Sequence, residues 1–299
     1  MATLLIHGRS VEIPDLSRVV YPGEDVLKGD VLHYYFRVAP VVMPHMRGRT
    51  LTLGRARDDS ERVDSPGTAD DAVPGWVRVA ASEEDGSPTS VVADEPAVLA
   101  VLVQRSCFTP HASLSRVGTP RRPDRLVFDL NPPALCDEAY LEVCQAAHAL
   151  GALILELGLV PFAMTSGSRG VHVHVPIHPQ RFEVVSSFAR AVARQLVLAN
   201  RCRLGHAGRD GASGKVTIDA LPSAHRRTFV VPYGLRALPG APVATPQSWG
   251  ELGAAGTGPR DHTISSVFTR LARAGDPWRH IDGFARCLPR RATGVGVTA

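Results

Sequence analysis

Hydrophobic residues recur along the chain with helical spacing in some segments and in short runs in others. Val31, Tyr34, Tyr35 and Val38 are spaced i, i+3, i+4 and i+7, which predicts a helix that opens at Gly29-Asp30. Further helices are predicted over 96–104, 138–157, 182–200 and 263–274. In the second of these, the expected buried residues are Leu141, Val143, Ala147 and Leu150. Strands are predicted over 4–8, 10–13, 76–80, 126–130, 161–164, 171–175, 216–219 and 228–231.

The order of elements between residues 126 and 219 is strand, helix, hairpin, helix, strand. A hairpin inside such a unit favours antiparallel pairing, so we predict an α+β fold rather than a doubly wound parallel sheet. We expect one stand-alone domain over 1–299. It is divided into an N-terminal α/β module (1–124) with a mobile acidic loop (57–75), a core (125–282) and a C-terminal tail (283–299).

Charge is distributed unevenly. The net charge is +4, but the segment 57–95 carries eleven acids and three arginines, a local charge of −8, which leaves +12 on the rest of the chain. A basic body of this kind favours a polyanionic ligand such as nucleic acid or a nucleotide. The alternative is compositional: only two of the basic residues are lysines, and heavy use of arginine also suits a GC-rich genome.

Cysteine use and hydropathy narrow the cellular setting. The five cysteines form no CxxC pair, which argues against disulfides and a thiolate zinc site. No apolar run approaches the roughly 18 residues of a membrane span, and the N-terminal residues do not resemble a signal peptide. We therefore expect a cytoplasmic, nucleoid-associated protein with no membrane partner.

Two acids lie at the ends of predicted strands. Asp129 and Asn131 are two residues apart, so their side chains share one face of a strand while Phe128 and Leu130 point to the core. Together with Asp219 on another strand, they are oxygen donors that suit Mn²⁺ or Mg²⁺ beside phosphate oxygens. For either acid taken alone, the favoured interpretation is that it merely ends a strand.

A Gly/Ser turn joins the two strands of the predicted hairpin. Residues Ser166-Gly-Ser-Arg-Gly170 offer backbone N–H groups, hydroxyls and a guanidinium, a combination that suits a triphosphate. It lacks the GK[ST] ending of a P-loop, and Gly/Ser hairpins are common. His172 follows directly and is placed to reach a ligand of the turn. His174 and His178 are expected to be surface or packing residues, and His111 to be a loop histidine.

Taken in order, these segments resemble the polymerase domain of the bacterial non-homologous end-joining ligase D, a branch of the archaeo-eukaryotic primase superfamily. The resemblance covers nearly the whole chain and is far more specific than any single motif. It is carried by Ser17-Arg-Val-Val-Tyr-Pro22, Lys28-Gly-Asp-Val31, Tyr34-Tyr35, Pro44-His-Met-Arg-Gly-Arg49, Pro110-His111, Arg122-Pro-Asp-Arg-Leu-Val-Phe-Asp129, Ser166-Gly-Ser-Arg-Gly-Val-His172, Ile218-Asp219, Val231-Pro-Tyr-Gly-Leu-Arg236 and Pro239-Gly-Ala-Pro-Val-Ala-Thr-Pro246.

The resemblance implies a primase-polymerase core with an RRM-like antiparallel catalytic sheet that adds nucleotides to DNA ends in double-strand-break repair. Its acids hold two divalent ions, usually with a preference for Mn²⁺. Its implied partners are DNA ends, a nucleoside triphosphate, and a separate ligase and end-binding protein. The implied roles are metal binding and catalysis for Asp129, Asn131 and Asp219; nucleotide binding for Ser166, Arg169, His172, Arg236 and His111; and binding of the DNA 5′-phosphate for Arg18 and Lys28.

Three positions depart from the family pattern. Asn131 stands at the place of a third metal-binding acid, Gly54 at that of a nucleotide-contacting lysine, and Pro222 at that of a residue that is often polar. Losing one metal-site charge commonly costs orders of magnitude in an electrostatically driven reaction.

Three functions therefore stay open at this point. The first is a DNA-end nucleotidyltransferase, weakened by Asn131. The second is a non-catalytic module that binds DNA ends, and the third is a nucleotide-utilising enzyme of specialised metabolism.

Overall fold

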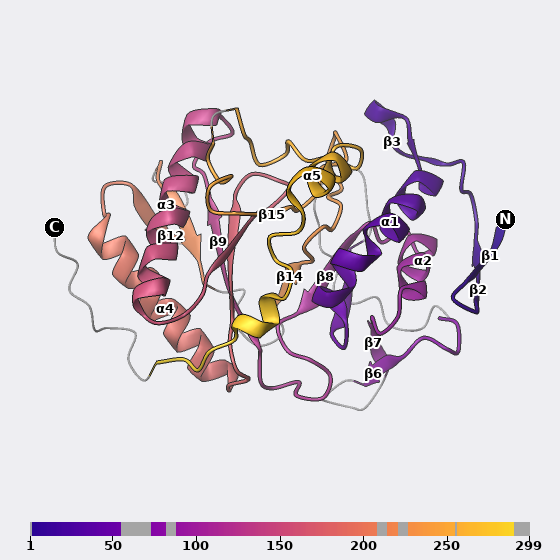
Figure 1. Cartoon of the computed structure of the whole chain (residues 1–299), viewed down its shortest axis with the longest axis horizontal. Coiled ribbons are helices and arrows are strands. Elements are labelled where there is room, and N and C mark those ends of the chain that lie inside the picture. Colours follow the sequence, from indigo (N-terminus) through magenta and orange to yellow (C-terminus); the bar gives the residue numbers. More distant parts are fainter. Residues whose placement is uncertain are drawn as a thin grey trace. The chain divides into compact units, whose positions relative to one another are not determined.

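The chain folds into two units made of interleaved segments. The computed structural model describes residues 2–54, 73–81, 88–207, 214–220, 227–254 and 256–289. Unit 1 comprises Met1–Gly118, Thr228–Ala244 and His262–Ala272, and unit 2 comprises Thr119–Arg227, Thr245–Asp261 and Arg273–Ala299. The chain thus returns twice to unit 1, whereas the three parts expected from the sequence (1–124, 125–282 and 283–299) are consecutive. The colours of Figure 1 follow the chain through these segments.

Unit 1 is built on a five-stranded antiparallel sheet of order β14-β8-β5-β7-β6. Two hairpin-like pairs precede this sheet in sequence, β1 with β2 and β3 with β4. Its strands are β1 (Ala2–Ile6), β2 (Arg9–Ile13), β3 (Val19–Tyr21), β4 (Val26–Leu27), β5 (Thr50–Gly54), β6 (Val79–Ala81), β7 (Pro88–Val92), β8 (Thr109–Ser113) and β14 (Thr228–Val230). Its helices are α1 (Lys28–Met46), α2 (Ala97–Gln104) and α5 (Val267–Ala274) up to residue 272, with a 3₁₀ turn at Pro22–Glu24.

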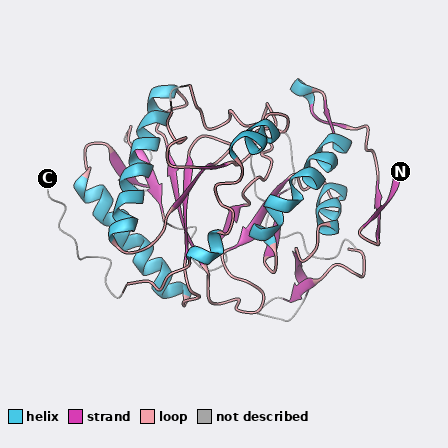
Figure 2. Cartoon of the chain, in the orientation of Figure 1, coloured by secondary structure: helices cyan, strands magenta, loops and turns pink. Residues whose placement is uncertain are grey.

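Unit 2 is built on a six-stranded sheet of order β12-β13-β9-β11-β10-β15. All neighbouring strands are antiparallel except β12 and β13, which are parallel. Its elements are β9 (Arg125–Asn131), α3 (Asp137–Glu156), β10 (Phe162–Thr165), β11 (Val171–Pro176), α4 (Phe182–Ala199), β12 (Leu204–His206), β13 (Val216–Asp219), β15 (Pro246–Gln247) and the 3₁₀ helix η3 (Ile281–Phe284). Figure 2 shows the same helices and strands by type.

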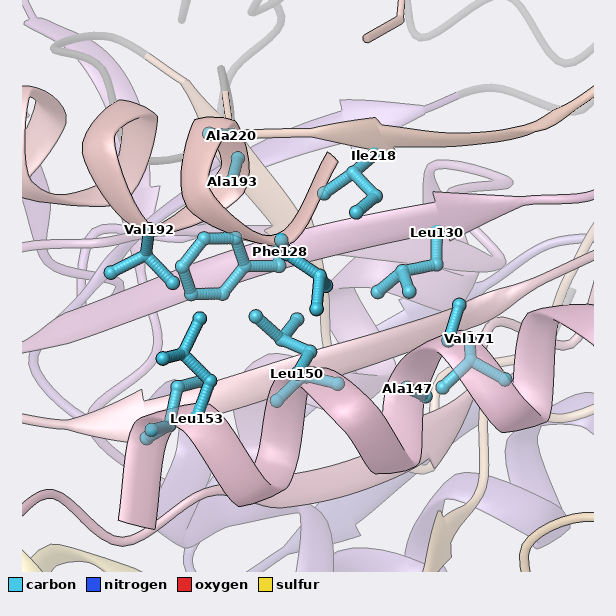
Figure 3. Close-up of a cluster of buried hydrophobic side chains, with 14 of the residues drawn as sticks. Phe128, Leu130, Ala147, Leu150, Leu153, Val171, Val192, Ala193, Ile218 and Ala220 are labelled. Carbon is cyan, nitrogen blue, oxygen red and sulfur yellow. The ribbon is translucent and has the colours of Figure 1, made fainter. Parts of the chain in front are cut away.

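Helices α3 and α4 cover one face of the sheet of unit 2. Phe128 and Leu130 of β9 are fully buried against them, as the period of two along a strand predicts. Figure 3 shows Phe128 between Val192 of α4 and Leu150 of α3. Each such side chain contributes roughly 1.5–3 kcal/mol by burial, so this layer fixes the register of β9 and leaves its other face for polar residues.

The structure confirms the α+β prediction and corrects several details. Leu141, expected in the core, is 46% exposed, because the buried face of α3 runs through Tyr140, Cys144 and Ala147 instead. His111 lies on strand β8 rather than in a loop. Helix α5 starts at Val267 rather than at residue 263. In the part of the chain that the structure describes, no helix is long and apolar enough to span a membrane.

Some predictions fall on residues that the structure does not describe. These are most of the acidic loop (57–72), Pro222 and the last ten residues of the tail (290–299).

Candidate active site

Three polar residues form a row across neighbouring strands of unit 2. Asp219 of β13 lies directly opposite Asp129 of β9, and His172 of β11 lies directly opposite Asp129 on the other side. Directly opposed residues in antiparallel strands project from the same face, with Cβ atoms about 4.5–5.5 Å apart. The row is therefore on the face opposite Phe128 and Leu130. The structure thus brings together two acids that are far apart in sequence.

Asp129 is the central member of this row. Its side chain is 29% exposed, and its Oδ1 lies 3.4 Å from Nε2 of His172, whose side chain is 12% exposed. This Oδ1 atom is buried and accepts no hydrogen bond within the described residues. A buried carboxylate oxygen without a hydrogen bond is costly unless a cation or donor satisfies it. The residue therefore suits a ligand that approaches this face.

The donors at this row fit one hard divalent cation. Two carboxylates in register supply the oxygen ligands that Mg²⁺ and Mn²⁺ prefer. No group of three His, Cys, Asp or Glu side chains that could hold a metal occurs among the residues the structure describes. Asp129 and Asp219 thus stand as a pair, and the third oxygen donor that the sequence predicted is the amide of Asn131.

Asn131 lies one pleat further along β9, on the same face as Asp129. Its strand partner is Thr217 of β13. Its Oδ1 accepts a hydrogen bond of 2.9 Å from Nε of Arg169 in the Gly/Ser turn. The sequence placed Asn131 and Arg169 in two separate groups of candidates, metal ligand and phosphate contact, but in the structure they bind each other.

The Gly/Ser turn is organised around its first serine. The backbone N–H groups of Ser168, Arg169 and Gly170 lie 3.2, 3.2 and 3.0 Å from Oγ of Ser166, which accepts from them. These N–H groups therefore point inward, whereas the sequence suggested an open nest for phosphate. Arg169 remains the cationic side chain of the turn, and Ser166 acts as its internal scaffold.

Two further residues position this turn. Gly170 approaches β9 so closely that a Cβ atom there would lie 2.0 Å from the carbonyl oxygen of Leu130. Arg260 donates from Nε to the carbonyl oxygen of Ser168 at 2.6 Å. Sequence reasoning missed Arg260, since it lies 92 residues from Ser168 in an irregular segment without a motif.

His174 is a packing residue, which is one of the two roles expected for it. It is completely buried, and its ring centroid is 4.9 Å from that of Trp278 and 6.1 Å from that of His172. Trp278 in turn donates from Nε1 to the carbonyl oxygen of Ala163 on β10. The ring of His172 therefore packs against His174, which in turn packs against Trp278.

In unit 1, tyrosine hydroxyls hold the loop that carries Arg236. Tyr34 donates to the carbonyl oxygen of Tyr233 at 2.6 Å, and Tyr21 to that of Arg236 at 3.0 Å. Tyr35 donates to the carbonyl oxygen of Phe108 at 2.6 Å and accepts from the N–H of Leu235 at 3.1 Å. Burial raises the pKa of Tyr34 and Tyr35 well above the usual range, so both hydroxyls stay protonated donors. The sequence placed Tyr34 and Tyr35 on one face of a helix and in a family motif, but it did not show which groups their hydroxyls bind.

His111 lies on β8, an interior strand of the sheet of unit 1. It is paired with Thr52 of β5 on one side and Val230 of β14 on the other. It is half-buried, and its Nδ1 is 3.2 Å from the carbonyl oxygen of Thr109. Gly54, where we expect a departure from the family pattern, ends the neighbouring strand β5 and is paired with Thr109.

Arg18 and Lys28 are neighbours at the start of α1. The N–H of Lys28 donates to the carbonyl oxygen of Arg18 at 2.8 Å. Arg18 is exposed and donates to Oγ of Ser106, whereas Lys28 is 2% exposed and its Nζ donates to the carbonyl oxygen of Gln104 at 3.0 Å. Burial lowers the pKa of Lys28, and the charge of Arg18 lowers it further. A buried cation beside an exposed one is a suitable site for an anion.

Comparison with known proteins identifies the family. The family model described as the LigD primase-polymerase domain matches residues 27–278, which is most of the chain. The chain belongs to the LigD primase-polymerase family. This is a nucleotidyltransferase family whose members are primase-polymerases of non-homologous end joining and depend on metal ions. The resemblance inferred from the sequence is thereby confirmed.

Individual relatives agree with this assignment. The polymerase domain of Mycobacterium tuberculosis ligase D, solved in complex with DNA, superposes with a TM-score of 0.80 at 29% identity, covering 92% of this chain and 99% of that one. The multifunctional non-homologous end-joining protein LigD of Mycobacterium bovis is 29% identical over 94% of this chain and 38% of its own length. The bifunctional LigD of Bacillus subtilis is 24% identical over 93% of this chain and 46% of its own length. The chain thus spans less than half of the curated relatives it matches.

Proposed function

We propose that the chain is a DNA-end-directed nucleotidyltransferase of double-strand-break repair that uses Mn²⁺ or Mg²⁺ and a nucleoside triphosphate. The observation that carries the proposal is the register of Asp219, Asp129 and His172 across three neighbouring strands. Two carboxylates and an imidazole lie on one face of the sheet, and Arg169 of the Gly/Ser turn is bonded to Asn131 on that face. Membership of the LigD primase-polymerase family supports the reaction class.

The residues of unit 2 have distinct parts in this proposal. Asp129 and Asp219 hold the cation, which when bound supplies Lewis-acid polarisation of phosphate oxygens. Arg169 binds and orients the triphosphate, since a guanidinium offers several donors in a fixed plane. Ser166 keeps the turn in shape, and His172 orients the Asp129 carboxylate and contacts the nucleotide.

Unit 1 supplies binding groups in the same proposal. His111 and Arg236 contact the nucleotide, and Arg18 and Lys28 bind the 5′-phosphate of a broken DNA end. The support for Arg236 is the loop that three tyrosine hydroxyls hold in one conformation. The support for Lys28 is its burial next to Arg18, which leaves a cationic site that a phosphate dianion would neutralise.

A primer-extension assay tests the proposal. A labelled duplex with a 5′-phosphorylated overhang is incubated with Mn²⁺ and either ribonucleoside or deoxyribonucleoside triphosphates. We expect nucleotide addition by the wild-type chain and none by Asp129→Ala, with Glu183→Ala as a control because that acid is exposed on α4 away from the row. Product from wild type no greater than from Asp129→Ala would reject catalysis.

A second candidate is a non-catalytic module that binds DNA ends. It is favoured by Asn131, which is neutral and already bonded to Arg169. Under this alternative, end binding survives Asp129→Ala and falls when the 5′-phosphate is removed. Relatedness to a polymerase domain solved with DNA favours both DNA-directed functions over an enzyme of specialised metabolism.

A further inference from the structure

The environment of Asn131 differs from that of a free metal ligand. Its Oδ1 accepts from the Arg169 guanidinium at 2.9 Å. The same oxygen lies 3.1 Å from the point where a Cβ atom on Gly170 would be. Thus the atom that a second cation would need is enclosed by the turn and already engaged by a positive charge.

Electrostatics at this position oppose a second divalent cation. The two ions of a two-metal site lie about 3.5–4 Å apart, and they repel each other strongly unless carboxylates lie between them. Here position 131 is a neutral amide. A cation bound by its Oδ1 would also lie close to the positively charged guanidinium of Arg169.

The situation at Asp129 is the reverse. Its Oδ1 is buried and accepts no hydrogen bond from the part of the chain that the structure describes, and the second carboxylate of the site, Asp219, lies directly opposite on β13. Both negative charges of the row are therefore at one end of the site. The positive charge of Arg169 is at the other end, next to the turn.

We propose that this site holds a single divalent cation, between Asp129 and Asp219, and that the Arg169 guanidinium takes the place of a second cation beside Asn131. In this arrangement Arg169 neutralises triphosphate oxygens directly. Arg260 supports it by holding the carbonyl oxygen of Ser168, so that the turn stays fixed when the nucleotide binds. The inference rests on the proposed function for the identity of the nucleotide, but its test does not depend on turnover.

The test counts Mn²⁺ ions by electron paramagnetic resonance, using the full chain without nucleotide or DNA. Wild type is expected to bind one Mn²⁺ per chain with the spectrum of an isolated ion. Asp129→Ala should weaken this binding at least tenfold. Arg181→Ala is the matched control, because Arg181 is also an arginine of unit 2 but its side chain is 76% exposed and pairs with Glu183; it should leave the count at one.

Two variants then address the role of Arg169. Asn131→Asp alone should still bind one Mn²⁺ tightly, because Arg169 would pair with the new carboxylate. The double variant Asn131→Asp with Arg169→Ala should bind two, with the spin coupling of neighbouring ions. If that protein does not fold, as judged by circular dichroism, Asn131→Asp with Arg169→Gln preserves more of the side-chain volume and gives the same readout.

The outcomes separate this inference from the proposed function. Two coupled Mn²⁺ ions in wild type, no Mn²⁺ at all, or a double variant that still binds one would each overturn the inference. Primer extension by a wild type that binds two ions would leave the proposed function intact. One bound ion without any primer extension would leave the inference intact and reject the function.

Discussion

At the residue scale, Gly170 occupies a position where no side chain fits. Its closest neighbour is a backbone carbonyl of β9, which cannot turn aside as a flexible side chain would. We expect Gly170→Ala to lower the free energy of unfolding by roughly 1–3 kcal/mol, the usual cost of forcing atoms into a packed site. Urea denaturation measures this. Gly250→Ala, also in unit 2, should be near neutral, because no described atom lies within 4 Å of the point where its Cβ would be; equal effects would contradict the account.

The lowered pKa of Lys28 makes the stability of the fold depend on pH. Its pKa is lower in the folded chain than the ordinary value of 10.5, so between these two values the unfolded chain binds more protons and the contribution of Lys28 to stability rises with pH. Lys28→Met lacks this proton. It should be more stable than wild type at pH 7, on the order of 1 kcal/mol for removal of a buried ion, and the difference should shrink toward pH 10.5.

Thermal or urea unfolding at several pH values measures the effect of Lys28. Lys215→Met is the control, since Lys215 is the only other lysine and is bonded at the surface to the carbonyl oxygen of Arg201. A Lys28→Met protein less stable than wild type at pH 7 would show that the buried charge stabilises the fold.

The sequence predicted some of these residue-level features and not others. The period of two along a strand is sufficient to place Asp129 and Asn131 on one face and Phe128 on the other. The hydrogen bond between Arg169 and Asn131 was not predictable, because it depends on the exact approach of the turn to β9. The inward direction of the turn N–H groups was missed for the same reason, since a Ser side chain competes with any ligand for them.

At the scale of elements, the loop bearing Arg236 depends on the tyrosines of α1. Tyr35→Phe removes two hydrogen bonds, to the carbonyl of Phe108 and from the N–H of Leu235, whereas Tyr34→Phe removes one, to the carbonyl of Tyr233. Unsatisfied buried groups cost about 1–3 kcal/mol each. We therefore expect Tyr35→Phe to destabilise the chain more than Tyr34→Phe in chemical denaturation. The reverse order would contradict the assigned hydrogen bonds.

Element prediction succeeded where the pattern was long and failed where it was short. The helices α3 and α4 begin and end within a residue or two of their predicted limits, because each shows several turns of helical spacing. Strand β8 was read as a loop, since Pro110 interrupts a five-residue segment whose sheet partners come from distant parts of the chain. Short strands owe their formation to such partners more than to their own sequence.

At the scale of the whole molecule, a basic body with a local acidic segment should bind DNA in a salt-dependent way. Each phosphate neutralised contributes roughly −0.9 to the slope of log K against log salt for duplex DNA. Arg18→Ala should reduce the magnitude of this slope by about 1 on ends with a 5′-phosphate and change it little on ends without one. Fluorescence anisotropy at several salt concentrations measures both.

Arg181→Ala is the control for that experiment, because its loss of one positive charge is equal but its side chain is exposed beside Glu183. Equal slopes for the Arg18 and Arg181 variants on phosphorylated ends would remove Arg18 from the proposed phosphate site. They would also show that the salt dependence reflects the basic composition of the chain as a whole and not a specific phosphate site at Arg18.

The arrangement on which the whole account depends is the pair of carboxylates on β9 and β13. It is tested most directly by a crystal of this chain soaked in Mn²⁺ and measured at a wavelength where manganese scatters anomalously. We predict one anomalous peak within about 2.5 Å of carboxylate oxygens from both Asp129 and Asp219. A crystal with no peak at this pair, or with manganese bound only elsewhere, would contradict the account.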